Sequence, residues 1–204
     1  PCEHFSDCGG CTFQNFDYNE QIAAKEMQVK DVFRRIGGFQ DVQSEPIIGC
    51  DEIFYYRNKM EFTFSKHEYV PENEKERSPS DFSLGLHTQG RWNKILNINE
   101  CHIQAPIANE ILQSIKKLTK DLEPYNMREH TGFLRNVMIR VGTNTKEVMV
   151  NIITSREDEE SLIPIKDSLI ITFPSITSIV NNITTRKSGV SMGEHQIVLH
   201  GNEY

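Results

Sequence analysis

The chain opens with Pro1-Cys-Glu-His-Phe-Ser-Asp-Cys-Gly-Gly-Cys11, in which three cysteines fall within a short stretch. Cys2, Cys8 and Cys11 could present three thiolates to one metal centre. The two glycines before Cys11 allow the backbone to fold tightly there, because glycine adopts positive φ without steric cost. A tetrahedral metal site or an iron–sulfur cluster needs four ligands. The stretch therefore predicts a fourth cysteine elsewhere in the chain.

The 204-residue chain has the composition of a folded domain. It is 37% hydrophobic and 25% charged, which predicts a packed core. No apolar run approaches the ~20 residues that cross a bilayer, and no signal segment opens the chain. We therefore expect a cytoplasmic protein that does not bind membranes. In that reducing compartment, the close cysteines indicate metal or redox chemistry and not disulfides.

The formal net charge of −7, taken alone, argues against nucleic acid as a partner, because phosphates are bound by Lys and Arg. The charges are unevenly distributed, however. Acidic residues gather in residues 68–76 and 157–160, whereas basic residues recur in pairs elsewhere. A local basic face on an acidic protein therefore remains compatible with the sequence.

Helices are predicted at three places. Residues 18–36 carry apolar residues at helical spacing after a capping box at Asp17 and Glu20, and two glycines end the pattern. Residues 106–122 form an amphipathic helix with a proline in its first turn. A third, short helix is predicted over residues 157–165.

Strands are predicted at seven places, and the first carries two cations. Residues 55–65 alternate between apolar and polar side chains, which predicts a half-buried strand with Arg57 and Lys59 on its solvent side. The polar stretch 66–81 is predicted to be a long mobile loop. The other strands are predicted at residues 82–86, 94–98, 133–141, 147–154, 176–184 and 196–200, with the basic connection Arg186-Lys187-Ser188-Gly189 before the last. This order predicts an α+β fold with a largely antiparallel sheet flanked by helices.

The fourth cysteine ligand has two candidates by position, Cys50 and Cys101. A structural zinc site usually pairs its cysteines in two close knuckles. Iron–sulfur sites commonly combine three clustered cysteines with one remote ligand. The spacing therefore favours an iron–sulfur cluster over zinc, and it leaves both candidates open.

Several separate motifs now carry a resemblance to a known family. They are Cys-x5-Cys-Gly-Gly-Cys, Tyr-Arg-Asn-Lys at residues 56–59, Cys-x-Ile at 101–103 and Gly-Phe-Leu-Arg-Asn-Val-Met-Ile-Arg at 132–140. In this order they resemble the uracil-5 RNA methyltransferase family, and within it the branch that modifies ribosomal RNA and carries a [4Fe–4S] cluster. The resemblance covers essentially the whole chain. It implies that Cys2, Cys8, Cys11 and Cys101 hold the cluster and that Cys50 does not.

The resemblance also implies a division into domains. Residues 1–16 would be the cluster-binding segment, and residues 17–204 a central α+β RNA-binding domain. The family's N-terminal RNA-binding barrel and its C-terminal Rossmann-like domain, which binds S-adenosylmethionine and holds the catalytic residues, would lie outside this chain. We therefore expect no catalytic residue and no S-adenosylmethionine site here. The expected state is a monomer that is inactive alone, with a structural cluster.

Ribosomal RNA is the partner that the resemblance implies, and six residues are candidates to contact it. Each single arginine is more often a solvated surface residue. The family motifs nevertheless favour a functional role, and Arg91-Trp92 places a cation beside a ring on which a base could stack. Strand periodicity puts Arg135 and Arg140 on opposite faces, unless a bulge intervenes. The candidates are Arg57, Lys59, Arg91, Trp92, Arg135 and Arg140. The alternative is a free-standing zinc-knuckle module that binds RNA without catalysis.

Overall fold

Strand β1 (Lys59–Ser65) runs through the middle of the molecule. In the computed structural model, residues 2–187 and 193–202 are described. Met60, Phe62 and Phe64 on alternate positions of β1 are at most 4% exposed and belong to the core. Their alternation follows from the strand geometry, in which successive side chains point to opposite faces. The predicted alternation of this segment is thus confirmed within β1.

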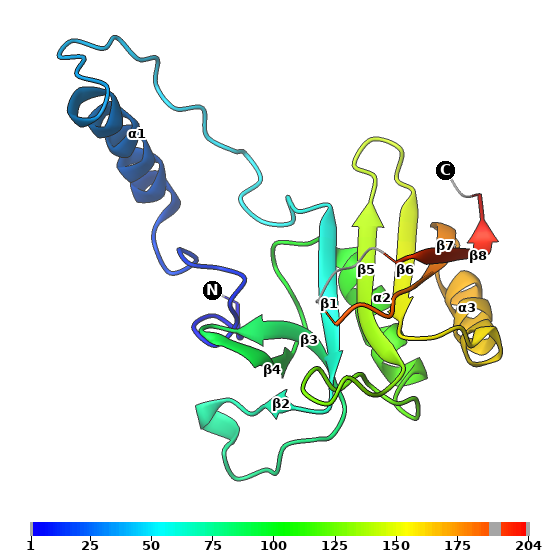
Figure 1. The fold of residues 1–204 in the computed structure, drawn as a ribbon. Coiled ribbons are helices and arrows are strands. Elements are labelled where there is room, and N and C mark those ends of the chain that lie inside the picture. The colour runs from blue at the N-terminus through cyan, green and yellow to red at the C-terminus, as the bar shows by residue number, and fades with distance from the viewer. Residues whose placement is uncertain (1, 188–192, 203–204) are drawn as a thin grey trace.

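The strands of the described residues form one eight-stranded sheet, in the order β2-β4-β3-β1-β5-β6-β7-β8 (Figure 1). Only the β2–β4 and β6–β7 pairs are parallel, and the other pairs are antiparallel. The predicted α+β class with a largely antiparallel sheet is therefore confirmed. The remaining strands are β2 (Glu68–Tyr69), β3 (Ser83–Thr88), β4 (Arg91–Asn97), β5 (Leu134–Val141), β6 (Val148–Thr154), β7 (Ile176–Ile183) and β8 (His195–Gly201).

Two helices cover one face of this sheet (Figure 1). They are α2 (Pro106–Leu118) and α3 (Glu159–Thr172), and their buried residues share one core with β1, β5 and β6. Helix α3 joins the parallel strands β6 and β7, which need a crossover connection. No helix in the described part of the chain is long and apolar enough to span a membrane.

Helix α3 is longer than the predicted helix of residues 157–165. Pro164 lies inside it, where proline removes a backbone donor and ordinarily disfavours a helix. Leu162, Ile165 and Leu169 are all buried at helical spacing on either side of the proline. Their packing against the sheet outweighs the local cost of the proline. The sequence pattern therefore predicted the C-terminal end of this helix too early.

Helix α1 (Tyr18–Arg35) begins and ends as predicted. The Asp17 carboxylate accepts hydrogen bonds from the backbone N–H groups of Asn19 and Glu20. After the helix, Gly38 adopts a φ of +72°, which suits glycine at a helix end. The local signals of capping and termination were therefore sufficient to define this helix.

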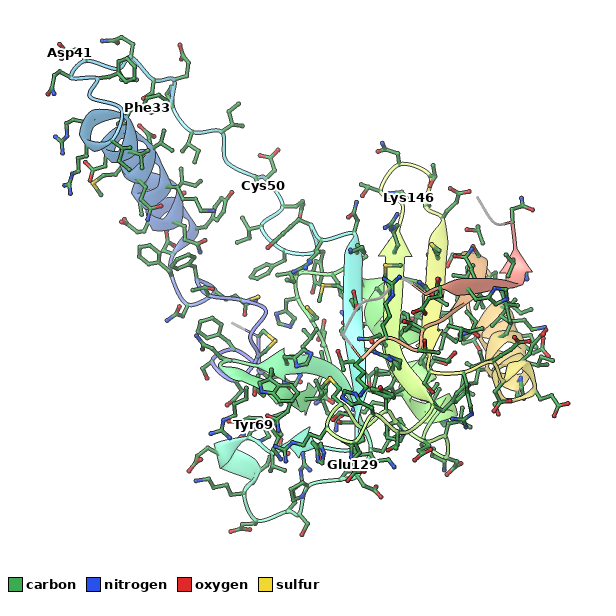
Figure 2. All side chains as sticks on the ribbon, viewed as in Figure 1. Phe33, Asp41, Cys50, Tyr69, Glu129 and Lys146 are labelled. Atoms are coloured by element: carbon green, nitrogen blue, oxygen red, sulfur yellow. The ribbon has the colours of Figure 1, made fainter. Side chains whose placement is uncertain are left out.

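Helix α1 and the segment that follows it project away from the sheet, and we call residues 18–50 the arm (Figure 1). No residue of α1 is buried. Phe33, Ile36 and Ile48 are 45%, 83% and 95% exposed. Figure 2 shows Phe33, Asp41 and Cys50 along this arm, far from Lys146 and Glu129 on the sheet. None of the apolar residues that predict the helix is thus buried, and most of them are exposed.

The predicted strand of residues 55–65 is shorter than expected, and this changes the position of Arg57. Tyr55 has a φ of +55°, which interrupts an extended chain. The Arg57 N–H donates to the Ile103 carbonyl at 2.7 Å, and Arg57 forms an isolated bridge with Gln104. The predicted strand therefore begins later than expected and leaves out Arg57, which pairs with the segment after Cys101, although Arg57 and Lys59 are both exposed.

The segment 66–81, predicted as a long loop, contains β2 and a 3-10 helix (Glu72–Glu74). Glu68 is only 2% exposed and organises the segment. Its carboxylate accepts two hydrogen bonds from Arg77, at 2.8 and 3.0 Å, and others from Ser80 N–H and Asn97. Burial alone would raise the pKa of Glu68, but these hydrogen bonds outweigh it and lower the pKa.

Candidate metal centre and RNA-facing groove

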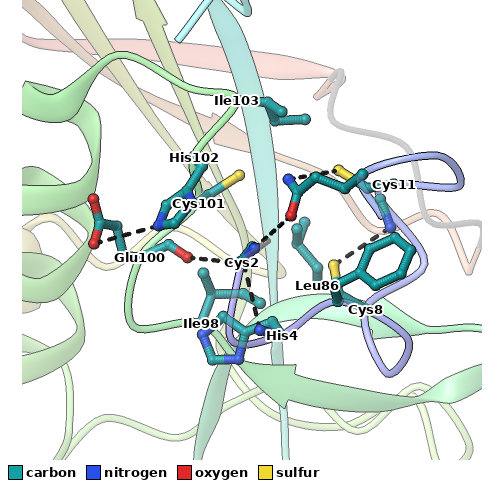
Figure 3. Close-up of a pocket in the computed structure, with 13 residues that line it drawn as sticks. Cys2, His4, Cys8, Cys11, Leu86, Ile98, Glu100, Cys101, His102 and Ile103 are labelled. Atoms are coloured by element: carbon teal, nitrogen blue, oxygen red, sulfur yellow. Dashed lines mark hydrogen bonds and ion pairs between the residues drawn. The ribbon is translucent and has the colours of Figure 1, made fainter. Parts of the chain in front are cut away.

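Four cysteines, three of them close in the sequence and one remote, line one cavity. Cys2, Cys8 and Cys11 come from the N-terminal loop, and Cys101 comes from the segment between β4 and α2 (Figure 3). The cavity is small, with a volume of about 20 Å³. Its other lining residues are mostly apolar or uncharged and include Phe5, Gly10, Gln14, Leu86, Ile98 and Ile103. All four predicted ligands therefore meet at one place.

The N-terminal loop is attached to the C-terminal end of β3. Cys8 forms an isolated antiparallel bridge with Thr88, and the Gly9 N–H donates to the His87 carbonyl at 3.0 Å. A Cβ at Gly9 would lie 3.1 Å from that carbonyl oxygen, so glycine permits this close approach. The buried His4 ring accepts a hydrogen bond from the Asn99 N–H at 3.0 Å. These contacts fix the loop beside the segment that bears Cys101.

Backbone and side-chain N–H groups point toward the sulfurs of the loop. The His4 N–H lies 3.4 Å from Cys2 Sγ, and the Gly10 N–H lies 3.3 Å from Cys8 Sγ. The Gln14 side-chain amide is 3.8 Å from Cys11 Sγ. Hydrogen bonds of this kind stabilise thiolates and tune the metal centres that they bind.

Cys101 is held by helix α2. The Cys101 N–H donates to Asn109 Oδ1 at 2.8 Å, and the Asn109 amide donates back to the Cys101 carbonyl at 3.2 Å. Asn109 is itself buried in the first turns of α2, where it also accepts from Gln104. This reciprocal pair orients the backbone of Cys101, so that the remote cysteine is placed by a rigid element.

The electrostatics of the cavity oppose free thiolates. Burial raises the pKa of Cys8 to about 11, and the neighbouring cysteines add to the rise. Burial likewise raises the pKa of Cys11 and of Cys101. A bound metal centre would reverse this, because its positive charge stabilises the thiolate form.

The described side chains do not form a ready-made metal-ligand group. Across residues 2–187 and 193–202, no group of three or more Cys, His, Asp or Glu side chains is placed to hold one metal ion.

Cys50, the other candidate ligand, lies elsewhere. It is exposed on the arm, its thiol donates to the Glu52 carbonyl at 3.0 Å, and its N–H donates to the Tyr18 hydroxyl. It lines a different and larger hollow between the arm and the outer side of Cys11. Spacing left Cys50 and Cys101 open as alternatives, and the tertiary structure brings only Cys101 to the cavity.

Three of the predicted RNA-contacting residues lie near the cysteine loop. Arg57 and Lys59 line a groove with Gly9, Gly10 and the β3–β4 turn. Arg140 lies directly opposite Lys59 in the β1–β5 register. Although Arg57 precedes β1, its side chain reaches the Lys59 carbonyl at 3.2 Å. These cations therefore gather at one end of the sheet.

Arg135 has a different environment. The β5–β6 register shifts between Leu134 and Asn136, so a bulge separates Arg135 from Arg140. Arg135 is 4% exposed, its guanidinium lies 4.3 Å from the centre of the Tyr125 ring, and it donates to the Thr184 carbonyl. Because of the bulge, simple alternation did not predict its surroundings. Its burial makes it a poor direct contact for a phosphate in solvent.

Arg91 and Trp92 do not join the other candidates in the groove. They begin β4, toward the edge of the sheet. The Arg91 guanidinium lies 5.8 Å from the centre of the Tyr69 ring, and Trp92 is 66% exposed.

The sequence analysis overlooked a set of polar residues on the open face of the sheet, which are Glu61, Thr63, His87 and Asn136. Their alternation with the core residues of β1 was the available signal.

The chain is similar in sequence to longer proteins. No protein-family model matches the chain. The chain is 33% identical over 210 residues to a protein of Chlorobaculum tepidum, and 37% identical over 214 residues to one of Porphyromonas gingivalis. Each is described as an uncharacterized RNA methyltransferase. All of this chain is matched, but it covers only 44% and 46% of those proteins, so it spans less than half of their length.

A solved structure shares the fold. It is the tRNA (uracil-54, C5)-methyltransferase of Pyrococcus abyssi in complex with S-adenosyl-L-homocysteine, with a TM-score of 0.63 and 24% identity. The match covers 97% of this chain and 46% of that one. The chain is thus homologous in sequence to RNA methyltransferases and has the fold of one part of such an enzyme.

Proposed function

We propose that this chain is the cluster-bearing and RNA-holding part of an S-adenosylmethionine-dependent uracil-5 RNA methyltransferase, with ribosomal RNA as its substrate. The observation that carries the proposal is the convergence of Cys2, Cys8, Cys11 and Cys101 on one cavity. The likeness to longer RNA methyltransferases supports it. Residues 1–16 would bind the cluster, and residues 17–204 would form the central domain between two parts that lie outside this chain.

A [4Fe–4S] cluster fits the donor set in the cavity. Four thiolates are its usual ligands, and each iron takes one of them, so the sulfurs stay farther apart than around one zinc ion. Methyl transfer to uracil needs no electron, so the role of the cluster would be structural. When bound, the cluster would supply a covalent cross-link. It would tie the N-terminal loop to Cys101 and close a loop of about 90 residues, which restricts the unfolded chain.

The methyl-transfer chemistry belongs to the part of the enzyme outside this chain. It requires a cysteine nucleophile that adds to the uracil ring and a base that removes the displaced proton. Cys50 does not serve as this nucleophile, because it lies on the arm and its thiol pairs with a backbone carbonyl. The role of this chain is therefore to present the RNA, in particular through Arg57, Lys59 and Arg140.

The cluster is tested by preparing the chain without oxygen and measuring iron, sulfide and the visible spectrum. We expect about four irons per chain and a broad brown absorption. Cys8→Ser should abolish both, whereas Cys50→Ser, the matched control, should leave both unchanged. Stoichiometric zinc without iron, or equal losses in the two variants, would contradict the cluster and favour the zinc-knuckle alternative.

The enzymatic assignment is tested by supplying S-adenosylmethionine and RNA transcripts to this chain and to the full-length protein. We expect the full-length protein to methylate a uracil of ribosomal RNA and this chain alone to transfer nothing. Methylation by the isolated chain would refute the proposed division of labour. A preference of the full-length protein for tRNA would correct the substrate and leave the reaction intact.

A further inference from the structure

A second polar hollow lies on the sheet face opposite to α2 and α3. Its volume is about 270 Å³, close to the lower end of the range for small-molecule sites. Its described lining combines hydrogen-bonding side chains with flat and apolar ones. The lining residues are Glu61, Thr63, Phe64, His87, Tyr125, Met127, Arg135, Asn136 and Lys187.

The floor of this hollow is a hydrogen-bonded row that crosses three strands. Thr63 of β1 lies directly opposite Asn136 of β5, and the Asn136 amide donates to the Thr63 hydroxyl at 3.1 Å. On the other side, the His87 ring of β3 lies 3.4 Å from the same hydroxyl. Thr63 and Asn136 are 8% and 7% exposed, so their orientation is set by the sheet. Such a floor is preorganised to meet the edge of a planar polar ligand.

Arg135 and Tyr125 line one side of the hollow and are only 4% and 5% exposed. The Arg135 guanidinium lies over the Tyr125 ring at 4.3 Å from its centre. Arginine planes and aromatic rings are the surfaces that proteins use against unstacked nucleobases. The half-buried Met127 adds an apolar surface, and the exposed Lys187 adds a cation at the rim.

The hollow is continuous with the cationic groove near the cysteine loop. Glu61 and His87 line both, and the groove adds Arg57 and Lys59. A single strand that crosses the sheet could therefore place its phosphates near these cations and one base in the hollow. Glu61 stands where the two meet, and a carboxylate there accepts hydrogen bonds but offers none.

We propose that the hollow floored by Thr63 and Asn136 binds an unpaired nucleobase of single-stranded RNA and that Glu61 selects a base with an exocyclic amino group. The proposal rests on the RNA-holding role proposed above. A cytosine amine donates to the carboxylate, whereas uracil presents a carbonyl oxygen at the same position and repels it. The base read here would be a neighbour of the methylated uracil, which itself must leave its stack to be modified.

The test compares the affinities of the chain for oligo(C) and oligo(U) of about ten nucleotides, measured by fluorescence anisotropy at fixed salt. The two bases have similar size and differ at two neighbouring positions, where cytosine has an amine and an unprotonated N3 and uracil has a carbonyl oxygen and an N3–H. We expect oligo(C) to bind about tenfold more tightly than oligo(U), the discrimination typical of one well-placed base contact.

Glu61→Leu should bring this ratio close to one. The matched control is Glu147→Leu, which removes the same charge at the β5–β6 turn, outside the lining of the hollow, and should raise both affinities without changing their ratio. Glu61→Gln keeps the shape of the side chain and adds a donor for the uracil oxygen, so it should shift the ratio toward oligo(U). Glu61→Gln also tests the role of the carboxylate if Glu61→Leu does not fold.

Equal affinities of the unaltered chain for the two oligonucleotides would overturn the base site and leave the RNA-holding role standing. A control variant that changed the ratio as much as Glu61→Leu would overturn the site as well. If the chain bound neither oligonucleotide, both the base site and the RNA-holding role would fall.

Discussion

The eight-stranded sheet and the arm contrast in how their apolar residues are covered. In the sheet, Phe62, Leu84 and Ile152 are fully buried between the strands and the two covering helices. On the arm, an 18-residue helix carries apolar residues at the correct spacing and buries none of them. A helix of this length is marginal on its own, because most helix stability in proteins comes from packing. The arm is thus locally well specified but globally unsupported within the described chain.

This contrast teaches that two parts of one chain can follow the same sequence rules with different energetic consequences. Burial of apolar surface stabilises the folded chain by about 25 cal/mol per Å² removed from water. The sheet obtains this stabilisation and the arm does not. Contiguous exposed apolar surface on a soluble protein ordinarily marks a contact site. The sheet can therefore hold the cysteine cavity and the groove rigidly without help from the arm.

The contrast predicts its largest effect for truncation of aromatic residues. Phe62→Ala should lower the free energy of unfolding by about 4 kcal/mol, because it leaves a cavity in the core. Phe33→Ala, the matched change on the arm, should cost less than about 1 kcal/mol, since its ring is 45% exposed. Urea unfolding of both variants measures the difference. Similar costs for the two would break the contrast by showing that the arm is packed.

A smaller effect is expected for ion pairs. Arg77→Ala removes the partner of the buried Glu68 and should cost about 2 kcal/mol at neutral pH, less than for a fully buried pair because water screens the half-exposed Arg77. Arg35→Ala, which breaks the exposed pair with Asp31, should change stability by no more than about 0.5 kcal/mol. Chemical denaturation of the two variants and the parent chain checks both values.

The pH dependence of the Arg77 effect has a definite sign. The folded chain lowers the pKa of Glu68 from its ordinary value of 4.5, so the stabilisation is present above that value and is lost as the pH falls through the lower folded pKa. The cost of Arg77→Ala should therefore shrink under acid conditions. A cost that stayed constant with pH would show that packing, and not the carboxylate, dominates at this site.

Much of the fold could be predicted from local patterns. The alternation in residues 59–65, the capping by Asp17 and the proline at the start of α2 each depend on neighbours a few residues away. The misjudged parts have a different cause. Pro164 is accommodated by packing, Glu68 is held by partners from its own segment and from β4, and the bulge at Arg135 arises from pairing with β6.

The same division applies to the candidate site. The sequence alone determined that Cys2, Cys8 and Cys11 lie close together, because a short loop leaves them no alternative. Its spacing did not decide between Cys50 and Cys101 as the fourth ligand, a choice that the family resemblance made in favour of Cys101. Only the tertiary structure showed that α2 places Cys101 at the cavity while Cys50 lies on the arm. The physical reason is that contacts across about 90 residues depend on how the sheet and helices pack, which no local pattern encodes.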